Sequence, residues 1–203
     1  MRITAIALQV KNPTRYSLFV DEKYAFSLSA DALLDSGLVQ GQELSKDELT
    51  AYKKASQDDK AYNLTLVYIA RRMRSEGELQ DYFRRKGYTD DFGRTVLPKL
   101  RRLGLVDDVE FARKWVENRR LLKNTSTKKL RLELRQKHIP DEIVRVVLVD
   151  DPTDEHDMLQ ELIAKKRKQT RYQDDQKLIA YLARQGFDYG EIKSAFQRRV
   201  DDE

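Results

Sequence analysis

The sequence predicts a mainly α-helical protein with three tandem three-helix repeats in an elongated array, preceded by a small N-terminal β-hairpin segment. Three observations support this fold class. Alternation of apolar and polar residues, which is typical of strands, is confined to the first thirty residues. Apolar residues at helical spacing occupy the chain from about residue 61 onward. One helical pattern then occurs three times, starting at Leu79, Leu130 and Leu178, and such a period is typical of stacked helical units.

The N-terminal segment is expected to contain the strands. Apolar residues alternate with polar or small ones in three stretches, at residues 6–10, 16–20 and 24–28. The turn-forming residues Asn12 and Pro13 separate the first two stretches, and the polar residues 21–23 separate the last two. We therefore expect antiparallel strands joined by short turns.

Two short helices are expected to follow the strands. Ser29 is a suitable N-cap for a helix over residues 30–36, and Gly37 can adopt the left-handed conformation that ends a helix. Ser45 and Glu48 have the spacing of a capping box, so a further helix is expected to start immediately after Ser45.

Each copy of the repeated pattern contains two apolar residues four positions apart, a turn position and a further apolar residue. The apolar pairs are expected in the core, and they are Leu79, Phe83, Leu130, Leu134, Leu178 and Leu182. Gly87 and Gly186 occupy the turn position in the first and third copies, and a positive φ is expected for both. The apolar residues that follow the turns are Phe92, Ile143 and Ile192.

The repeats are expected to begin with amphipathic helices over residues 61–74, 109–122 and 155–168. The predicted domains are an N-terminal segment and three repeats, at residues 1–60, 61–108, 109–152 and 153–203. Gly104 is expected to end one helix and Asp107 to cap the next, with Glu110 at the third helical position. Pro98 lies inside a helical pattern and is expected to kink or split that helix.

The composition argues against enzymatic and membrane functions. The chain has no cysteine and no apolar run long enough to span a membrane, so we expect a cytoplasmic protein without disulfides. His138 and His156 lie in different repeats, which makes a zinc site improbable. No glycine-rich phosphate-binding motif is present. We therefore expect no cofactor, no metal and no catalytic residue.

The central part of the chain is basic. Counting Lys and Arg against Asp and Glu gives −1 for residues 1–60, +9 for residues 61–149 and −3 for residues 150–203. Such a concentration of charge is a candidate contact surface for phosphates or for an acidic protein. The candidate cations of residues 113–137 are Arg113, Lys114, Arg119, Arg120, Lys123, Lys128, Lys129, Arg131, Arg135 and Lys137. The alternative is a solvated surface, with Arg113 and Glu117 as an ordinary i,i+4 pair.

A second basic group lies at the ends of the preceding helices. It contains Arg71, Arg72, Arg74, Arg84, Arg85 and Lys86. A helix C-terminus also favours cations through its dipole, which gives a purely structural explanation for part of this group.

Two further features have structural interpretations. Phe111 and Trp115 are four residues apart and are expected to pack between repeats, although Trp115 could also stack on a base. Asp107 and Asp108 are adjacent, so their side chains do not face one another on a helix, and helix capping is the better explanation.

Two segments resemble the signatures of the RecX family of bacterial regulators. Residues 70–79, ARRMRSEGEL, resemble the Arg-rich helix end followed by Ser and Glu-Leu. Residues 104–112, GLVDDVEFA, resemble the second signature of that family. The sequence departs from the family pattern at His138, where glycine is usual, and at Pro98.

The resemblance implies a non-enzymatic protein that binds RecA recombinase filaments on DNA and mostly inhibits ATP hydrolysis, filament growth and strand exchange. Its partners would be RecA and, weakly, DNA. The charge pattern predicts that the cations of both basic groups make these contacts, and we expect a monomer. The alternatives are a DNA- or RNA-binding module without a RecA partner, and a scaffold protein. Replacing Arg119, Arg120, Lys128 and Lys129 together with Glu is expected to weaken filament binding without unfolding the protein.

Overall fold

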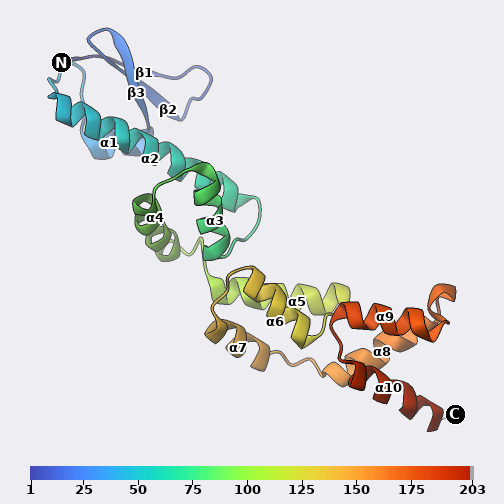
Figure 1. Cartoon of the computed structure of the whole chain (residues 1–203). Helices are drawn as coiled ribbons and strands as arrows, with labels where there is room; N and C mark the ends of the chain where they lie inside the picture. The colour runs from blue at the N-terminus through green and yellow to red at the C-terminus, as the bar shows by residue number, and fades with distance from the viewer. Residues whose placement is uncertain (202–203) are drawn as a thin grey trace. The chain divides into compact units, whose positions relative to one another are not determined.

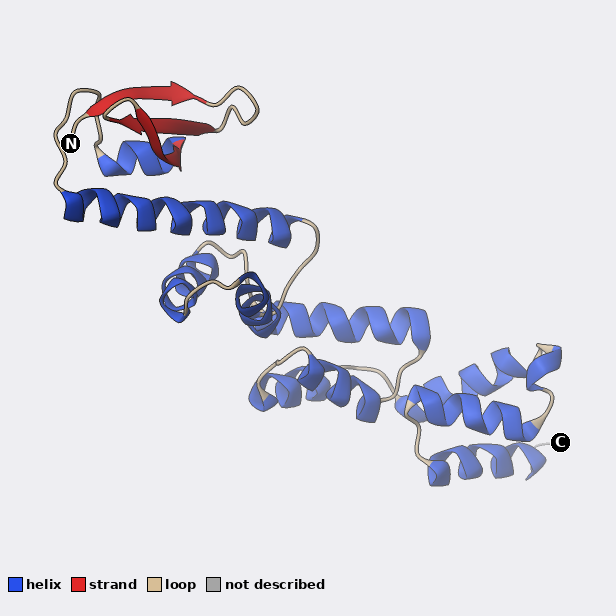
Figure 2. Ribbon diagram, turned by 45° about the horizontal axis from the view of Figure 1, so that its top comes forward, coloured by secondary structure: helices blue, strands red, loops and turns tan. Residues whose placement is uncertain are grey.

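The computed structural model describes residues 1–201, which form three strands and a majority of helix (Figures 1 and 2). The predicted fold class, mainly α-helical with a small β segment at the N-terminus, is therefore confirmed. The chain forms two compact units: residues 1–72 with 88–96, and residues 73–87 with the chain from residue 97 onward. The predicted third repeat ends at residue 203, and residues 202–203 lie outside the described range.

The first unit contains a three-stranded antiparallel sheet rather than a hairpin alone. The strands β1 (Ile3–Leu8), β2 (Arg15–Val20) and β3 (Lys23–Ser29) pair in chain order. Asp21 and Glu22 connect β2 to β3 with φ values of 48° and 68°, which is the backbone of a type I′ hairpin turn. The predicted alternation is confirmed for β2 and β3, since Leu18, Phe26 and Leu28 point into the core of this unit. It is wrong for the first stretch, because Leu8 and Val10 are exposed and the buried residue of β1 is Ile3.

Two helices complete the structure next to the sheet. They are α1 (Ala30–Ser36) and α2 (Lys46–Ala70). The predicted caps are confirmed, because the Ser29 hydroxyl caps α1, Gly37 ends it with a φ of 63°, and Ser45 and Glu48 form a capping box. The helix α2 runs without a break through residues 60–61, where the sequence predicts the start of a repeat.

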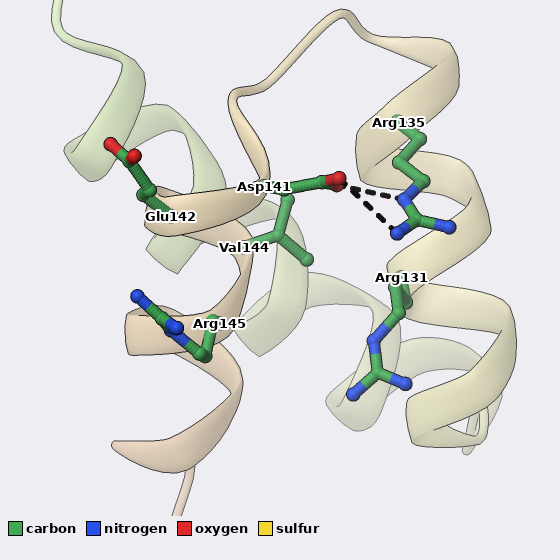
Figure 3. A pocket seen from close by; sticks show the side chains of 6 residues that line it. All are labelled: Arg131, Arg135, Asp141, Glu142, Val144 and Arg145. Carbon is green, nitrogen blue, oxygen red and sulfur yellow. Dashed lines mark hydrogen bonds and ion pairs between the residues drawn. The ribbon is translucent and has the colours of Figure 1, made fainter.

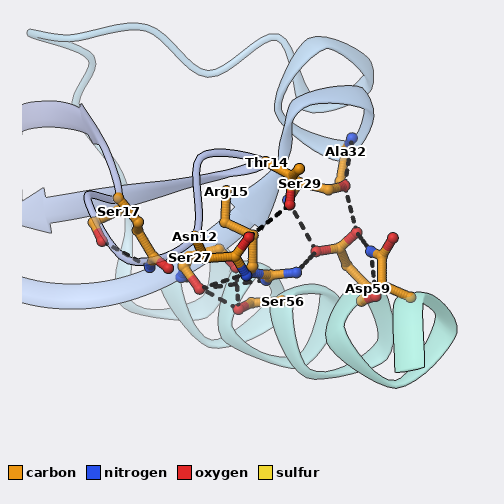
Figure 4. Close-up of polar contacts among 11 residues, drawn as sticks. Asn12, Thr14, Arg15, Ser17, Ser27, Ser29, Ala32, Ser56 and Asp59 are labelled. Carbon is orange, nitrogen blue, oxygen red and sulfur yellow. Dashed lines mark hydrogen bonds and ion pairs between the residues drawn. The ribbon is translucent and has the colours of Figure 1, made fainter. Parts of the chain in front are cut away.

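A buried ion pair attaches the sheet to α2 (Figure 4). The Arg15 guanidinium lies 2.8 Å from the Asp59 carboxylate, and both side chains are 10% exposed. Arg15 also donates to the Ser27 carbonyl at 2.7 Å, while Asp59 accepts from the Ser29 hydroxyl at 2.6 Å. Because both side chains of the pair form further hydrogen bonds, its burial is compensated.

The remaining helices are those expected for the repeats. They are α3 (Glu76–Lys86), α4 (Asp90–Arg102), α5 (Asp108–Lys123), α6 (Thr127–Gln136), α7 (Asp141–Val149), α8 (Glu155–Arg167), the 3-10 helix η1 (Thr170–Tyr172), α9 (Asp175–Gln185) and α10 (Tyr189–Asp201). Pro98 does not split α4. It lies on the exposed side of the helix, where the carbonyl of Arg94 that loses its hydrogen bond can be solvated.

The second and third repeats each enclose a separate hydrophobic core. The leucine pairs predicted for the core are confirmed: Leu79, Leu130, Leu134, Leu178 and Leu182 are fully buried, and Phe83 is 4% exposed. The anchor of the second repeat is Val144 rather than Ile143, since Val144 is 2% exposed and Ile143 only partly buried. Val144 follows Leu130 by the same distance along the chain as Ile192 follows Leu178, so these two repeats share one spacing.

Two equivalent junctions connect the middle helices to the next repeat. In the first junction, Glu76 N–H donates to the Asp108 carboxylate at 2.8 Å, and the Ser75 hydroxyl donates to the carbonyl of Lys137 at 2.7 Å. The second junction connects the equivalent positions one repeat later, with a backbone N–H in place of the serine hydroxyl as one donor. They are Thr127 N–H to the Glu155 carboxylate at 3.0 Å, and Ser126 N–H to the carbonyl of Gln185 at 3.0 Å. The N-terminus of a middle helix therefore binds the next repeat in both places.

Each junction requires one glycine. At the first junction the glycine lies in the middle helix, and at the second it lies at the turn of the following repeat. At the first junction, a Cβ added to Gly77 would lie 2.2 Å from the Cβ of His138. At the second, a Cβ added to Gly186 would lie 2.6 Å from the Cβ of Lys129. Gly186 and His138 occupy the same turn position, with φ values of 94° and 57°. The second repeat therefore tolerates His138 because Gly77 provides the space across the junction.

Asp108 is the junction residue whose charge is unfavourable. Burial raises the pKa of its carboxyl, and repulsion from Glu76 and Asp107 adds to the rise. Because the folded-state pKa is raised, the ionised carboxylate costs stability above that pKa, and the cost disappears as the pH falls. We expect Asp108→Asn, which keeps the acceptor oxygen for Glu76 N–H, to raise the melting temperature at pH 7. This gain in melting temperature should shrink towards pH 3.8, the ordinary pKa of an Asp carboxyl. Thermal unfolding at pH 7 and at pH 3.8 measures both values. A less stable variant at pH 7 would contradict this assignment.

Candidate functional site

The candidate cations near the start of the repeats belong to different units. Arg71 and Arg72 are exposed residues of the first unit, whereas Arg74, Arg84 and Arg85 belong to the second. Arg84 is exposed and forms an ion pair with Asp81 in its own helix. The helical part of this group is therefore partly neutralised.

Several cations of residues 113–137 bind neighbouring repeats instead of facing solvent. The Arg120 side chain is 9% exposed and lies 2.8 Å from the Asp151 carboxylate, whose side chain is 7% exposed. It also donates to the hydroxyl of Thr127 at 2.8 Å and to the carbonyl of Thr125 at 2.7 Å. We call this set, together with Glu155 at 3.8 Å, the Arg120 network.

Two lysines make similar connections. Lys129 donates to the carbonyl of Arg184 in the third repeat at 2.6 Å, and Lys137 pairs with Glu78 of α3 at 2.6 Å. The expectation that Arg119, Arg120, Lys128 and Lys129 can all be reversed in charge without unfolding therefore has to be revised. Arg120 and Lys129 hold the second junction, so their reversal would place two carboxylates against it.

Arg119 supports the core of its own repeat. Its guanidinium lies 4.4 Å from the centre of the Trp115 ring and 2.7 Å from the Glu133 carboxylate. Trp115 N–H donates to the same carboxylate at 2.9 Å, and its ring stacks on Phe111 at 5.9 Å. Trp115 therefore packs within the second repeat. The prediction that it packs between repeats is wrong.

The exposed cations of residues 113–137 are a smaller set. They are Arg113, Lys114, Lys123, Lys128, Arg131 and Arg135. Arg113 pairs with Asp150 at 3.7 Å rather than with Glu117, and Lys114 pairs with Glu110 at 3.0 Å. Lys128 lies 3.6 Å from Asp188 with a side chain that is 76% exposed. Exposed pairs of this kind are weak, so a charged partner can replace them at little cost.

A pocket of about 420 Å³ between α6 and α7 gathers three arginines (Figure 3). Its lining residues are Arg131, Arg135, Asp141, Glu142, Val144 and Arg145. Arg135 donates to both carboxylate oxygens of Asp141, at 2.8 and 3.3 Å. This hydrogen bonding lowers the pKa of Asp141, and the nearby charge of Arg131 contributes to the effect. Arg145 was not predicted as a site residue from the sequence, because Arg145 lies in the apolar segment of α7 outside the basic run.

Arg131 and Arg145 differ from Arg135, the third arginine of this pocket. Among the side chains that the structure describes, those of residues 1–197, none forms a hydrogen bond or ion pair with either guanidinium, and both residues are exposed. Figure 3 shows Arg131 extending from α6 towards α7, and Arg145 on α7 itself. The second repeat therefore offers two available guanidinium groups beside one pocket.

The described part of the chain lacks two other kinds of site. Among its residues, no three His, Asp or Glu side chains gather in a group that could hold a metal ion. None of the helices that the structure describes is both long and apolar enough to cross a membrane.

Family comparisons cover most of the chain. The regulatory protein RecX N-terminal domain matches residues 1–45, and the first, second and third three-helix domains of RecX match residues 61–104, 107–148 and 153–196. Among curated relatives, "Regulatory protein RecX" of Bacillus licheniformis is 32% identical over 96% of this chain and 76% of its own length. The protein of the same name from Bacillus pumilus is 29% identical over 98% of this chain and 78% of its own.

Solved structures agree with these relatives. A crystal structure of regulatory protein RecX covers 97% of this chain and 98% of its own, with a TM-score of 0.75 and 27% identity. The crystal structure of RecX from Lactobacillus salivarius covers 71% of this chain, with a TM-score of 0.59 and 25% identity. With four matching domains, three of them the helical repeats, the chain belongs to the RecX family of regulatory proteins.

Proposed function

We propose that this protein regulates RecA recombinase by binding RecA filaments on DNA, and that it acts without catalysing a reaction. The observation that carries the proposal is the match to RecX regulatory proteins over nearly the whole chain. The RecA filament as the partner is inferred from the resemblance of the sequence to the RecX family.

The junctions support binding to a repetitive partner. In both junctions a backbone N–H at the start of a middle helix donates to a carboxylate of the next repeat, which holds successive repeats in a fixed register. A protein with fixed repeats can make several weak contacts at once, and these contacts reinforce one another. The exposed cations Arg113, Lys114, Lys123, Lys128, Arg131 and Arg135 supply charge for such contacts, whereas Arg119, Arg120 and Lys129 support the fold.

The test is the rate of ATP hydrolysis by RecA on single-stranded DNA. Adding this protein at less than one molecule per RecA is expected to lower the rate and to shorten filaments seen by electron microscopy. Binding to RecA-coated DNA should be much tighter than binding to bare DNA. If hydrolysis and filament length stay unchanged while the protein binds bare DNA equally well, the alternative of a nucleic-acid-binding module without RecA replaces this proposal.

A further inference from the structure

We propose that the pocket between α6 and α7 binds the phosphodiester backbone of a nucleic-acid strand, with Arg131 and Arg145 each donating to a phosphate. This inference deepens the proposed function, because it names the nucleic-acid contact of a protein that we place on RecA–DNA filaments. It can be tested without RecA.

The two arginines are available for an external anion. Arg135, in the same pocket, already holds Asp141 through two hydrogen bonds. Arg131 lies one helical turn before Arg135, at i and i+4, so both side chains extend from the same face of α6. Among the residues that the structure describes, no acidic side chain pairs with Arg131 or Arg145, although Glu142 lines the same pocket. The pocket therefore contains two exposed guanidinium groups that form no hydrogen bond or ion pair with the side chains that the structure describes.

The arrangement of charge fits a strand with repeated anions better than a single anion. Lys128 precedes Arg131 by three residues, so Lys128, Arg131 and Arg135 form a row of cations along α6. At about 1.5 Å of rise per residue, this row is roughly 10 Å long. Arg145 adds a cation from α7 on another side of the pocket. Cations separated in this way can each take one phosphate of the same strand.

The polarity of the pocket favours nucleic acid over an acidic protein partner. Val144 is the one apolar residue among the six that line the pocket, and its side chain is buried in the core of the repeat. Protein–protein interfaces have apolar and aromatic centres from which charged residues are depleted, whereas protein–DNA interfaces are more polar and strongly positive. Guanidinium groups also bind phosphate with two parallel hydrogen bonds.

The experiment measures binding of a labelled oligothymidylate strand to the full-length protein at a series of salt concentrations. Arg131→Ala with Arg145→Ala is compared with Arg102→Ala with Arg184→Ala. The control pair removes the same charge from exposed arginines whose side chains lack an ion pair within residues 1–201. Losing two phosphate contacts should make the log–log slope of affinity against salt shallower by about 1.4. The control pair should leave the slope of the parent protein unchanged.

Several results would overturn the proposal. One is a slope that stays the same in the pocket variant, and another is an equal change in both variants, which would indicate a general effect of charge. Parent protein that does not bind the strand would also overturn it. If the pocket variant binds the strand normally but no longer lowers ATP hydrolysis by RecA, the pocket contacts protein. The phosphate assignment then fails and the proposed function stands.

A further pair of results would remove the proposed function and leave the phosphate site. A parent protein that does not affect RecA, together with a pocket variant that loses the salt dependence, would leave the phosphate site standing and remove the proposed function. Circular dichroism checks that each variant is folded. Arg131→Gln with Arg145→Gln repeats the measurement while keeping most of the side-chain stem, and it should show the same change in slope.

Discussion

Replacing Arg120 with alanine is expected to lower the free energy of unfolding by about 3–5 kcal/mol, the cost of leaving a buried ion pair without one partner. Asp151 would keep its charge with a side chain that is 7% exposed, and the hydroxyl of Thr127 and the carbonyl of Thr125 would lose their donor. Because the Arg120 network connects the second repeat to the third, the loss should also reduce the cooperativity of unfolding between them.

Urea denaturation measures both effects. The midpoint should fall, and the transition should broaden or separate into two steps as the third repeat unfolds first. Arg113→Ala is the matched control, because Arg113 lies on the same helix and its pair with Asp150 at 3.7 Å is exposed. That variant should lose less than about 1 kcal/mol. Equal losses in the two variants would show that the Arg120 network does not hold the junction.

Replacing Gly77 with alanine is expected to destabilise the protein by about 1–3 kcal/mol through overpacking. The new Cβ would lie 2.2 Å from the Cβ of His138, and neither atom can move without its backbone. Alanine is favoured over glycine within a helix by about 1 kcal/mol, so a net loss of stability would indicate that the steric conflict is larger than this gain.

A second substitution across the junction tests the same contact. His138→Gly removes the opposing Cβ, and glycine accepts the φ of 57° without strain. In the double variant, Gly77→Ala should cost little, with a coupling energy of at least about 1 kcal/mol in the double-mutant cycle. Gly87→Ala is the control, since no atom lies within 4 Å of a Cβ added to Gly87, and its φ of 69°, unlike the helical φ of Gly77, gives alanine a backbone cost that His138→Gly cannot relieve. If His138→Gly rescues both alanine variants equally, the two sides of the first junction are not in specific contact.

These junctions change how the basic run of residues 113–137 is understood. The sequence presents ten cations as one group, but the structure divides them by what they contact. Arg120 pairs with Asp151 in its own repeat and lies 3.8 Å from Glu155 of the third, Lys129 and Lys137 bind neighbouring repeats, Arg119 supports Trp115, and the others are exposed. A variant meant to test binding should therefore change exposed residues such as Arg131, and leave Arg120 unchanged.

Local patterns predicted most of the helical structure. The leucine pairs identified the core of each repeat, because residues four apart lie on one face of a helix. Caps at Ser29, Ser45 and Asp107 gave the starts of three helices, since capping depends on a few neighbouring residues. Two predictions differed from the structure in how far a helix extends. The helix α2 continues through residue 60, and α4 continues through Pro98.

The sequence by itself determined the number of repeats, their cores and their caps, because each depends on residues within a few helical turns. The tertiary structure alone decided which cations are available. Arg120 meets Asp151 at a separation of 31 residues, and Lys137 meets Glu78 at a separation of 59. No local spacing specifies such partners, since Arg120 meets Asp151 only when the second repeat folds, and Lys137 meets Glu78 only when that repeat packs against α3. For the same reason, Arg145 becomes a candidate ligand only when α7 packs beside α6.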